Sequence, residues 1–163
     1  MGQQSEDQRE SLDRFVQAQA GARGVGYVQA LAELRTGHKV THWIWYVLPQ
    51  LRALGRSAMA RDFGIADAEE AVAYATHPVL GPRLVDCVQA ILLHEAKGPQ
   101  AVLGAVDAMK LRSSLTLFER VAPQQSVFGL ALQRLYGGAR DEATLALLDS
   151  GAPVAGKGLS SAE

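Results

Sequence analysis

Apolar residues recur at intervals of three and four positions along most of the chain, and this spacing restricts the fold more than any other feature. It places side chains on one face of a helix. Only residues 42–48, rich in Trp, Ile, Tyr and Val, favour a strand, and no second run with strand periodicity exists to pair with them. An unpaired strand would leave backbone groups without partners, so we expect a short buried helix, started by Thr41 and ended near Pro49. The sequence therefore predicts an all-α fold.

Capping residues and breaks divide this pattern into about eight helices. Gly37 is a natural stop for the helix that precedes it. We predict one domain over residues 11–150, with flexible tails at 1–10 and 151–163. Four residues suited to accepting a backbone N–H stand ahead of predicted helices: Ser57, Asp67, Asp107 and Asp141.

Composition fits a single soluble domain. The chain has 163 residues, 48% of them hydrophobic and 20% charged, which is typical of a globular protein. Its 16 Lys and Arg against 17 Asp and Glu provide no overall field that favours nucleic acid or an anionic membrane. Residues 1–14 contain no apolar stretch, so we expect no signal peptide, and no apolar run approaches the roughly 18 residues that a spanning helix needs. Because Cys87 is the only cysteine, no intrachain disulfide is possible, and we expect a cytoplasmic location.

Both tryptophans lie close together, in a chain with few other aromatic residues. Neighbouring aromatic side chains cannot all point the same way, so Trp43 or Trp45 is expected to face a groove or the solvent, where it could stack on a flat ligand. Gln50 follows a proline, at a point where the chain must turn and can present its amide. The alternative is that the tryptophans only fill the core.

Two histidines precede these aromatics at a spacing that suits one face of a helix. His38 and His42 stand four residues apart, but a metal site needs a third and usually a fourth ligand. No acidic or cysteine partner lies nearby in the sequence, so we predict no metal site. His42 is instead grouped with the candidate ligand-binding residues.

Polar residues interrupt one of the apolar helices. Lys110, Ser113 and Ser114 fall on adjacent helical positions, which could form an anion or sugar-hydroxyl site with the lysine as a point charge. The alternative is a solvated lysine and serines bonded to their own helix.

A bend with two prolines separates two further candidates. His77 precedes the bend and can cap the helix that follows. Arg83 stands in the first turn of that helix, where a positive charge opposes the helix dipole, which suggests a partner. That partner is either a carboxylate such as Asp86 or an external anion.

Several motifs in this order resemble one bacterial protein family. They are Asp13-Arg-Phe15, His42-Trp-Ile-Trp45, Leu48-Pro-Gln50, Leu54-Gly-Arg-Ser57, His77-Pro-Val-Leu-Gly-Pro-Arg-Leu84, Lys110-Leu-Arg-Ser-Ser-Leu-Thr-Leu-Phe118 and the Gly-Gly-Ala-Arg-Asp-Glu-Ala-Thr-Leu stretch at 137–145. The family is catalogued as domain of unknown function 1810, and the resemblance covers roughly residues 12–148. It implies a single all-α domain without an established activity. The label calpastatin, sometimes given to this family, fits poorly, because calpastatin inhibitory segments are largely disordered before binding.

Three further features are a small-residue stretch before Leu80-Gly-Pro-Arg83, a helix with Lys110 ahead of it, and Asp141 late in the chain. They resemble the NADAR group of all-α proteins, which is associated with cleavage of N-glycosidic bonds in compounds like ADP-ribose. Three functions therefore stay open: a binder of a small polar ligand of the nucleotide or sugar-phosphate type, an N-glycosidase, and a domain for protein interaction. The glycosidase requires a carboxylate to stabilise an oxocarbenium-like positive charge on the sugar. The candidates are Asp13, Asp107 and Asp141.

The favoured hypothesis is geometric. One tryptophan anchors the core, while His42 and Gln50 face a pocket shared with the 77–83 bend and the 110–114 helix. The expected partner is a small molecule rather than nucleic acid or membrane. No cofactor is expected, and the oligomeric state is left open.

Overall fold

The computed structural model describes residues 2–151, with side chains from residue 6 onward. Over these residues the chain forms ten α-helices, a π-helical turn, a 3-10 turn and no strand, which confirms the all-α prediction. Three of the ten, α3, α4 and α7, have only four or five residues each. In chain order the elements are α1 (Gly2–Gln17), η1 (Ala18–Ala22), α2 (Tyr27–Thr36), α3 (Ile44–Val47), η2 (Arg52–Leu54), α4 (Ala58–Asp62), α5 (Ala68–Thr76), α6 (Leu80–Leu92), α7 (Pro99–Leu103), α8 (Ala105–Val121), α9 (Val127–Tyr136) and α10 (Glu142–Ser150).

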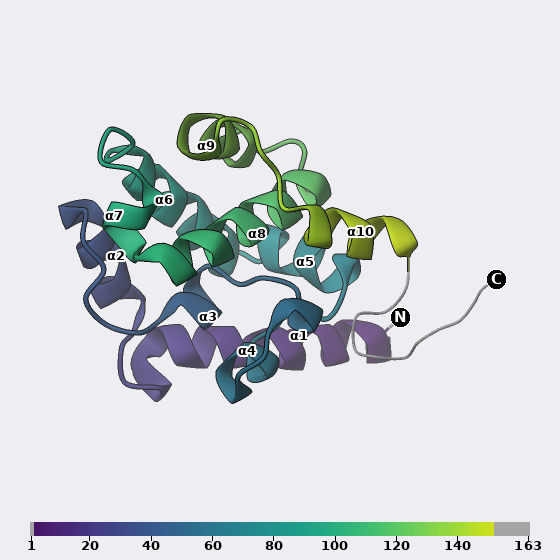
Figure 1. The fold of residues 1–163 in the computed structure, drawn as a ribbon. Helices are drawn as coiled ribbons and strands as arrows, with labels where there is room; N and C mark the ends of the chain where they lie inside the picture. The colour runs from purple at the N-terminus through teal and green to yellow at the C-terminus, as the bar shows by residue number, and fades with distance from the viewer. Residues whose placement is uncertain (1, 152–163) are drawn as a thin grey trace.

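Helix α8 runs through the middle of the molecule, and α1 lies along one edge (Figure 1). Helices α5, α7, α9 and α10 all pack against α8. Seven of the eight residues from 111 to 118, all but Arg112, are buried, so side chains on almost every side of the helix meet the core. Aromatic rings join α1, α5 and α8: the Tyr74 ring lies edge-on to Phe15 at 5.0 Å and 5.5 Å from Phe118.

Three of the four predicted caps are confirmed. Ser57, Asp67 and Asp141 each accept a backbone N–H from the residue three positions ahead, at 2.9 to 3.1 Å. The prediction for Asp107 was wrong, because α8 begins at Ala105, directly after Gly104. Gly104 has φ +90°, a conformation that glycine adopts without strain, and it lets the chain pass from α7 into α8 with no longer turn. Asp107 therefore lies in the first turn of α8.

The structure describes only one of the two expected tails. Helix α1 begins at Gly2, so residues 2–10 of the expected flexible tail are helical. The expected tail at the other end lies outside the described residues, apart from Gly151. Gly151 follows α10 in the left-handed conformation, with φ +68°.

The short buried helix predicted for residues 42–48 is confirmed as α3, but its start was not. Trp43, rather than Thr41, occupies the position before the helix. The Thr41 hydroxyl instead donates to the Glu33 carboxylate at 2.6 Å. A distant acceptor on α2 thus replaces the local cap that the sequence suggested.

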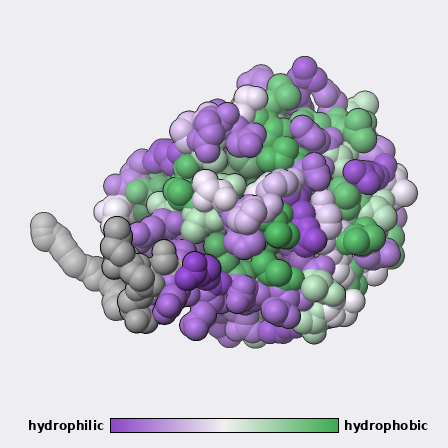
Figure 2. All heavy atoms as spheres, turned by 180° about the vertical axis from the view of Figure 1, so that it is seen from behind, coloured by the Kyte–Doolittle hydropathy of each residue, from purple (hydrophilic) through white to green (hydrophobic). Residues whose placement is uncertain are grey.

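The surface carries polar side chains around separate apolar patches (Figure 2). Across the described part of the chain, none of the helices has both the length and the apolar character needed to cross a membrane.

Candidate functional site

A groove of about 460 Å³ lies between the start of α8 and the segment that runs from Gln50 into α4. Its α8 wall includes Lys110 and Ser113. The residues at the start of α10 complete it, among them Asp141. Two of the three sequence segments that were expected to share a pocket therefore meet here.

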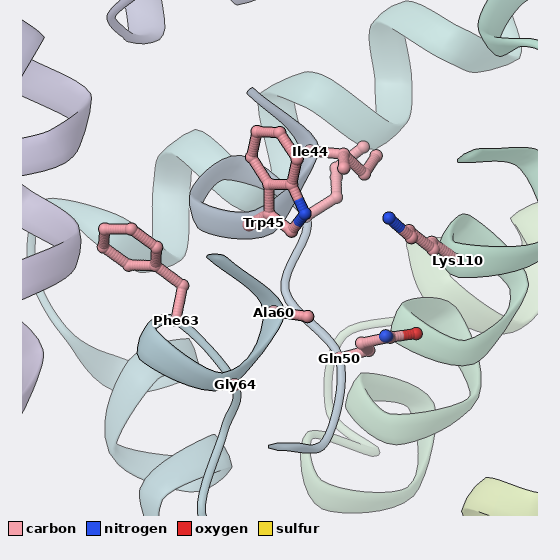
Figure 3. Close-up of a pocket in the computed structure, with 8 residues that line it drawn as sticks. Ile44, Trp45, Gln50, Ala60, Phe63, Gly64 and Lys110 are labelled. Carbon is pink, nitrogen blue, oxygen red and sulfur yellow. The ribbon is translucent and has the colours of Figure 1, made fainter. Parts of the chain in front are cut away.

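A narrow recess adjoins this groove and shares Gln50, Ala60 and Lys110 with it. Its further walls come from Trp45 in α3 and from Phe63 after α4 (Figure 3). The recess has a volume of about 10 Å³, which is room for one group the size of a water molecule. It can therefore admit a single oxygen atom of a larger ligand held in the groove.

The Trp45 indole N–H reaches this region without an acceptor. Its nitrogen is buried and has no hydrogen-bond partner among the described residues. It is drawn on the side of the indole that faces the Lys110 amine, which lies 5.6 Å from the ring centre (Figure 3). A buried donor left unpaired costs about 1–3 kcal/mol. Since an ammonium also has only donors to offer, both groups favour an acceptor oxygen in the space between them.

Lys110 is only weakly neutralised by the protein. Its Nζ lies 3.8 Å from Asp107 Oδ1, while Lys39 Nζ lies closer, 2.9 Å from Oδ2 of the same carboxylate. One negative charge is thus shared by two lysines. The pair retains a net positive charge that can attract an anion into the groove.

Asp141 is the carboxylate in the groove wall, and α10 uses one of its two oxygens. Oδ2 accepts from the backbone N–H of Thr144 at 2.9 Å and from its hydroxyl at 2.6 Å. Oδ1 lies 3.9 Å from Arg112 Nη2. Asp141 therefore repels a ligand anion less than a free carboxylate would.

The serines of the predicted anion site lie in two different environments. Ser113 lines the groove, but its hydroxyl donates to the Met109 carbonyl of its own helix at 3.3 Å. That contact is the back-bonded arrangement that the sequence left open for serine. Ser114 is buried and is not among the residues that line the groove.

The two tryptophan side chains differ in how deeply they are buried. Trp43 is completely buried, and its indole N–H donates to Glu33 Oε1 at 2.9 Å, so Trp43 is the one that anchors the core. Trp45 is only partly buried and borders the recess. His42 is exposed and lines neither the recess nor the groove, so the predicted pairing of His42 with Gln50 does not occur.

The 77–83 bend lies elsewhere, and its expected place in the shared pocket was wrong. His77 is a helix cap, since its Nδ1 accepts the backbone N–H groups of Val79 and Leu80 at 3.0 and 3.2 Å. It lines a separate hollow beside α1. Arg83 does not pair with Asp86: the guanidinium donates to Gln19 Oε1 at 3.2 Å and lies 4.6 Å from the Tyr27 ring centre. Gln19 and Tyr27 are far away in the sequence, which is why the partner could not be predicted.

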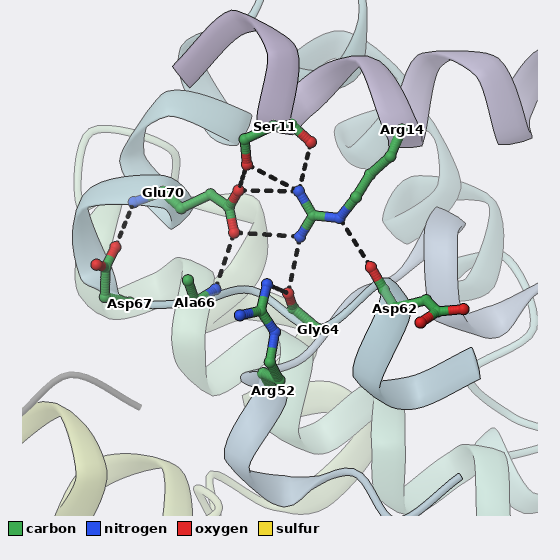
Figure 4. Close-up of polar contacts among 8 residues, drawn as sticks. All are labelled: Ser11, Arg14, Arg52, Asp62, Gly64, Ala66, Asp67 and Glu70. Carbon is green, nitrogen blue, oxygen red and sulfur yellow. Dashed lines mark hydrogen bonds and ion pairs between the residues drawn. The ribbon is translucent and has the colours of Figure 1, made fainter. Parts of the chain in front are cut away.

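Two buried carboxylates hold the segments that wall the recess. Glu33 accepts five hydrogen bonds, including those from the backbone N–H groups of Val40 and Thr41, and so orders the loop that leads into α3 and Trp45. Glu70 does the same for the loop after α4, through Arg14 (Figure 4). Sequence reasoning identified neither carboxylate, because a glutamate on a helix is usually solvated.

Sequence reasoning also missed several residues of the groove wall. Arg56 and Ser57 line its outer part, and both belong to a motif that supported the family resemblance. Val106 and Met109 precede Lys110 and Ser113 at helical spacing, a signal that could have assigned all four to one face of α8. No group of three or more side chains suited to hold a metal ion occurs within residues 2–151.

Comparison with known proteins places the chain among relatives without a described function. The family described as "Protein of unknown function (DUF1810)" matches residues 9–148. The crystal structure of the conserved hypothetical protein Rv1873 from Mycobacterium tuberculosis is 43% identical, with a TM-score of 0.80, over 85% of this chain and 96% of that chain. No curated protein shows significant similarity. The groove and the recess lie within the matched residues.

Proposed function

The chain belongs to the DUF1810 family, and we propose that its groove binds a small polar ligand of the nucleotide or sugar-phosphate type. The observation that carries this proposal is the buried, unpaired N–H of Trp45 beside the Lys110 ammonium. A phosphate oxygen in the recess accepts from both donors and brings a negative charge to the lysine. Hydrogen bonds in which one group is charged are about twice as strong as neutral ones.

The dimensions and charges of the groove support the same ligand class. The recess has room for one oxygen, and the adjoining groove of about 460 Å³ has room for the rest of a small molecule. Arg56 adds a second cation to the wall, and Gln50 and Ser57 add neutral polar groups. These groups suit phosphate and hydroxyl oxygens.

Two substitutions test the proposal by titration calorimetry with ribose 5-phosphate. Lys110→Ala is expected to weaken binding by about 10- to 100-fold, because it removes the ammonium. Trp45→Phe keeps an aromatic ring but removes the N–H, and it is expected to weaken binding by about tenfold. The stability of Trp45→Phe should change by less than about 1 kcal/mol, since losing an unpaired donor offsets the smaller ring. Loss of binding without loss of stability distinguishes a ligand contact from a packing contact.

Arg134→Ala is the matched control for the loss of a cation. Arg134 is exposed, forms a surface ion pair with Glu95 at 2.8 Å, and does not line the groove. Its variant should bind ribose 5-phosphate like the unmodified protein. Normal binding by Trp45→Phe would show that the recess is not the phosphate site. If the unmodified protein binds no phosphate compound at all, the interaction-domain alternative gains support.

A hydrolytic role has one observation in its favour. Of the three carboxylates considered from the sequence, only Asp141 lines the groove, and its Oδ1 takes no part in capping α10. Asp107 is paired with lysines, and Asp13 lies in the hollow beside His77. An N-glycosidase in this groove therefore depends on Asp141.

Incubation with ADP-ribose, followed by chromatography of the products, tests this second candidate. Turnover should be lost in Asp141→Asn, which retains a side chain that can cap α10. Stabilisation by ADP-ribose without product supports binding alone. Turnover that survives in Asp141→Asn excludes this carboxylate as the group that stabilises the oxocarbenium-like charge on the sugar.

A further inference from the structure

We infer that the groove selects a nucleoside monophosphate over a sugar phosphate, with the phosphate at the recess and the base against an apolar wall at the start of α8. The inference rests on the proposed function and adds the orientation of the ligand and the part of it that is recognised. It comes from residues that line the groove but not the recess beside Trp45.

The start of α8 exposes two large apolar side chains to water inside the groove. Val106 is 67% exposed and Met109 is 66% exposed, and both line the groove. Together with Lys110 and Ser113 they follow helical spacing, so the four form one stripe along α8. The stripe is apolar at the N-terminal end of the helix and polar from Lys110 onward. A ligand lying along it meets two chemically different halves.

The facing segment also contributes small and apolar residues to the groove. It includes Leu54, Gly55 and Ala60. Gly55 lies so close to α4 that a Cβ there would be 2.4 Å from the Ala60 Cβ, so this part of the wall is formed by backbone and small groups. These three residues offer apolar contact, whereas Gln50, Arg56 and Ser57 of the same segment supply the polar groups.

These surfaces match a planar ring better than a sugar. Covering exposed apolar area releases water from it, at about 25 cal/mol per Å², whereas the hydroxyl groups of a sugar would lose hydrogen bonds to water there. Met109 has a flexible, polarisable thioether that adapts to a ring face. A phosphate and a ribose would also leave much of the 460 Å³ unused. The geometry therefore points to a base as the third part of the ligand.

Titration calorimetry of the full chain with AMP, ribose 5-phosphate and adenosine tests this inference. AMP is expected to bind about tenfold more tightly than ribose 5-phosphate, and adenosine, which lacks the phosphate, more weakly than AMP. Met109→Ser should remove the advantage of AMP by bringing its affinity close to that of ribose 5-phosphate. Leu93→Ser is the control, because Leu93 is 74% exposed and does not line the groove.

The possible failures are distinguishable. Equal affinities for AMP and ribose 5-phosphate overturn the selection for a base and leave phosphate binding intact. A preference for AMP that survives in both Met109→Ser and Val106→Ser overturns the placement of the base on α8. Absence of binding by any of the phosphate compounds overturns the proposed function and, with it, this inference.

Discussion

Arg14→Ala is expected to lower the free energy of unfolding by about 3–5 kcal/mol, because it leaves the Glu70 carboxylate buried without its cation. The Glu70 side chain is only 4% exposed, and Arg14 lies 3.0 Å from it. The guanidinium also donates to the backbone oxygens of Asp62 and Gly64, at 2.9 and 2.8 Å (Figure 4). One side chain of α1 thus holds α5 and the loop after α4. Denaturation with urea at pH 7 measures the effect.

The exposed pair between Arg134 and Glu95 is the matched control for this effect. Their atoms are 2.8 Å apart, but the side chains are 52% and 40% exposed. Water screens such a pair, so Arg134→Ala should lower the free energy of unfolding by less than about 1 kcal/mol. A double variant, Arg14→Met with Glu70→Leu, should recover much of the loss, because no charge is then buried alone. Equal costs for Arg14→Ala and Arg134→Ala would contradict a stabilising role for the buried pair.

Glu33→Gln is expected to lower the free energy of unfolding by about 2–4 kcal/mol at pH 7. Burial by itself would raise the pKa of this carboxyl, but hydrogen bonds from Gln29, Thr41, Trp43 and the Val40 backbone outweigh it and lower the pKa from 4.5 to about 2. A glutamine amide can accept through only one oxygen, and its NH₂ group would face donors. The loop that carries Thr41 into α3 would then lose part of its anchorage. Chemical denaturation measures the cost.

The pH dependence of this cost follows from the same lowered pKa. Between pH 4.5 and about 2 the unfolded chain takes up a proton that the folded Glu33 does not yet bind. The contribution is therefore complete above pH 4.5, falls as the pH drops through this window, and is lost below about 2. Its full size is about 3 kcal/mol, at 1.36 kcal/mol per pKa unit. The difference between the unmodified protein and Glu33→Gln should narrow over this range.

An exposed glutamate on α5 provides a control that distinguishes this effect from general destabilisation by acid. Glu69 is exposed in the first turn of α5. Glu69→Gln should change stability by less than about 0.5 kcal/mol at pH 7. A difference between Glu33→Gln and the unmodified protein that stays constant down to pH 2 would contradict the proposed role of the Glu33 charge.

Features that depend on residues close together in the chain were predicted well. The caps at Ser57, Asp67 and Asp141 are confirmed, because each involves atoms only three positions apart. The helical nature of residues 44–47 is confirmed as well, since an isolated strand has no way to pair its backbone groups. Asp107 does not cap α8, because the helix already begins at Ala105, directly after Gly104.

The candidate site was predicted only in part. Gln50, Lys110 and Ser113 do line one groove, and Trp45 borders its recess. Their polar or aromatic side chains made them candidate ligand-binding residues in the sequence. Arg83 and His77 carry equally conspicuous groups, yet one meets Gln19 and the other caps its own helix. Chemical type alone does not separate a residue that is satisfied within the fold from one that is free for a ligand.

The sequence by itself determined the fold class, the order of the helices and most of their ends, because apolar spacing and capping act over a few residues. Tertiary structure alone decided which tryptophan is the anchor. Trp43 meets the Glu33 carboxylate on α2 and is buried with its N–H satisfied. Trp45, two residues on, faces Lys110 of α8 and has no acceptor in the part of the chain that the structure describes. That difference depends on where two distant helices lie, and packing of the whole core sets those positions.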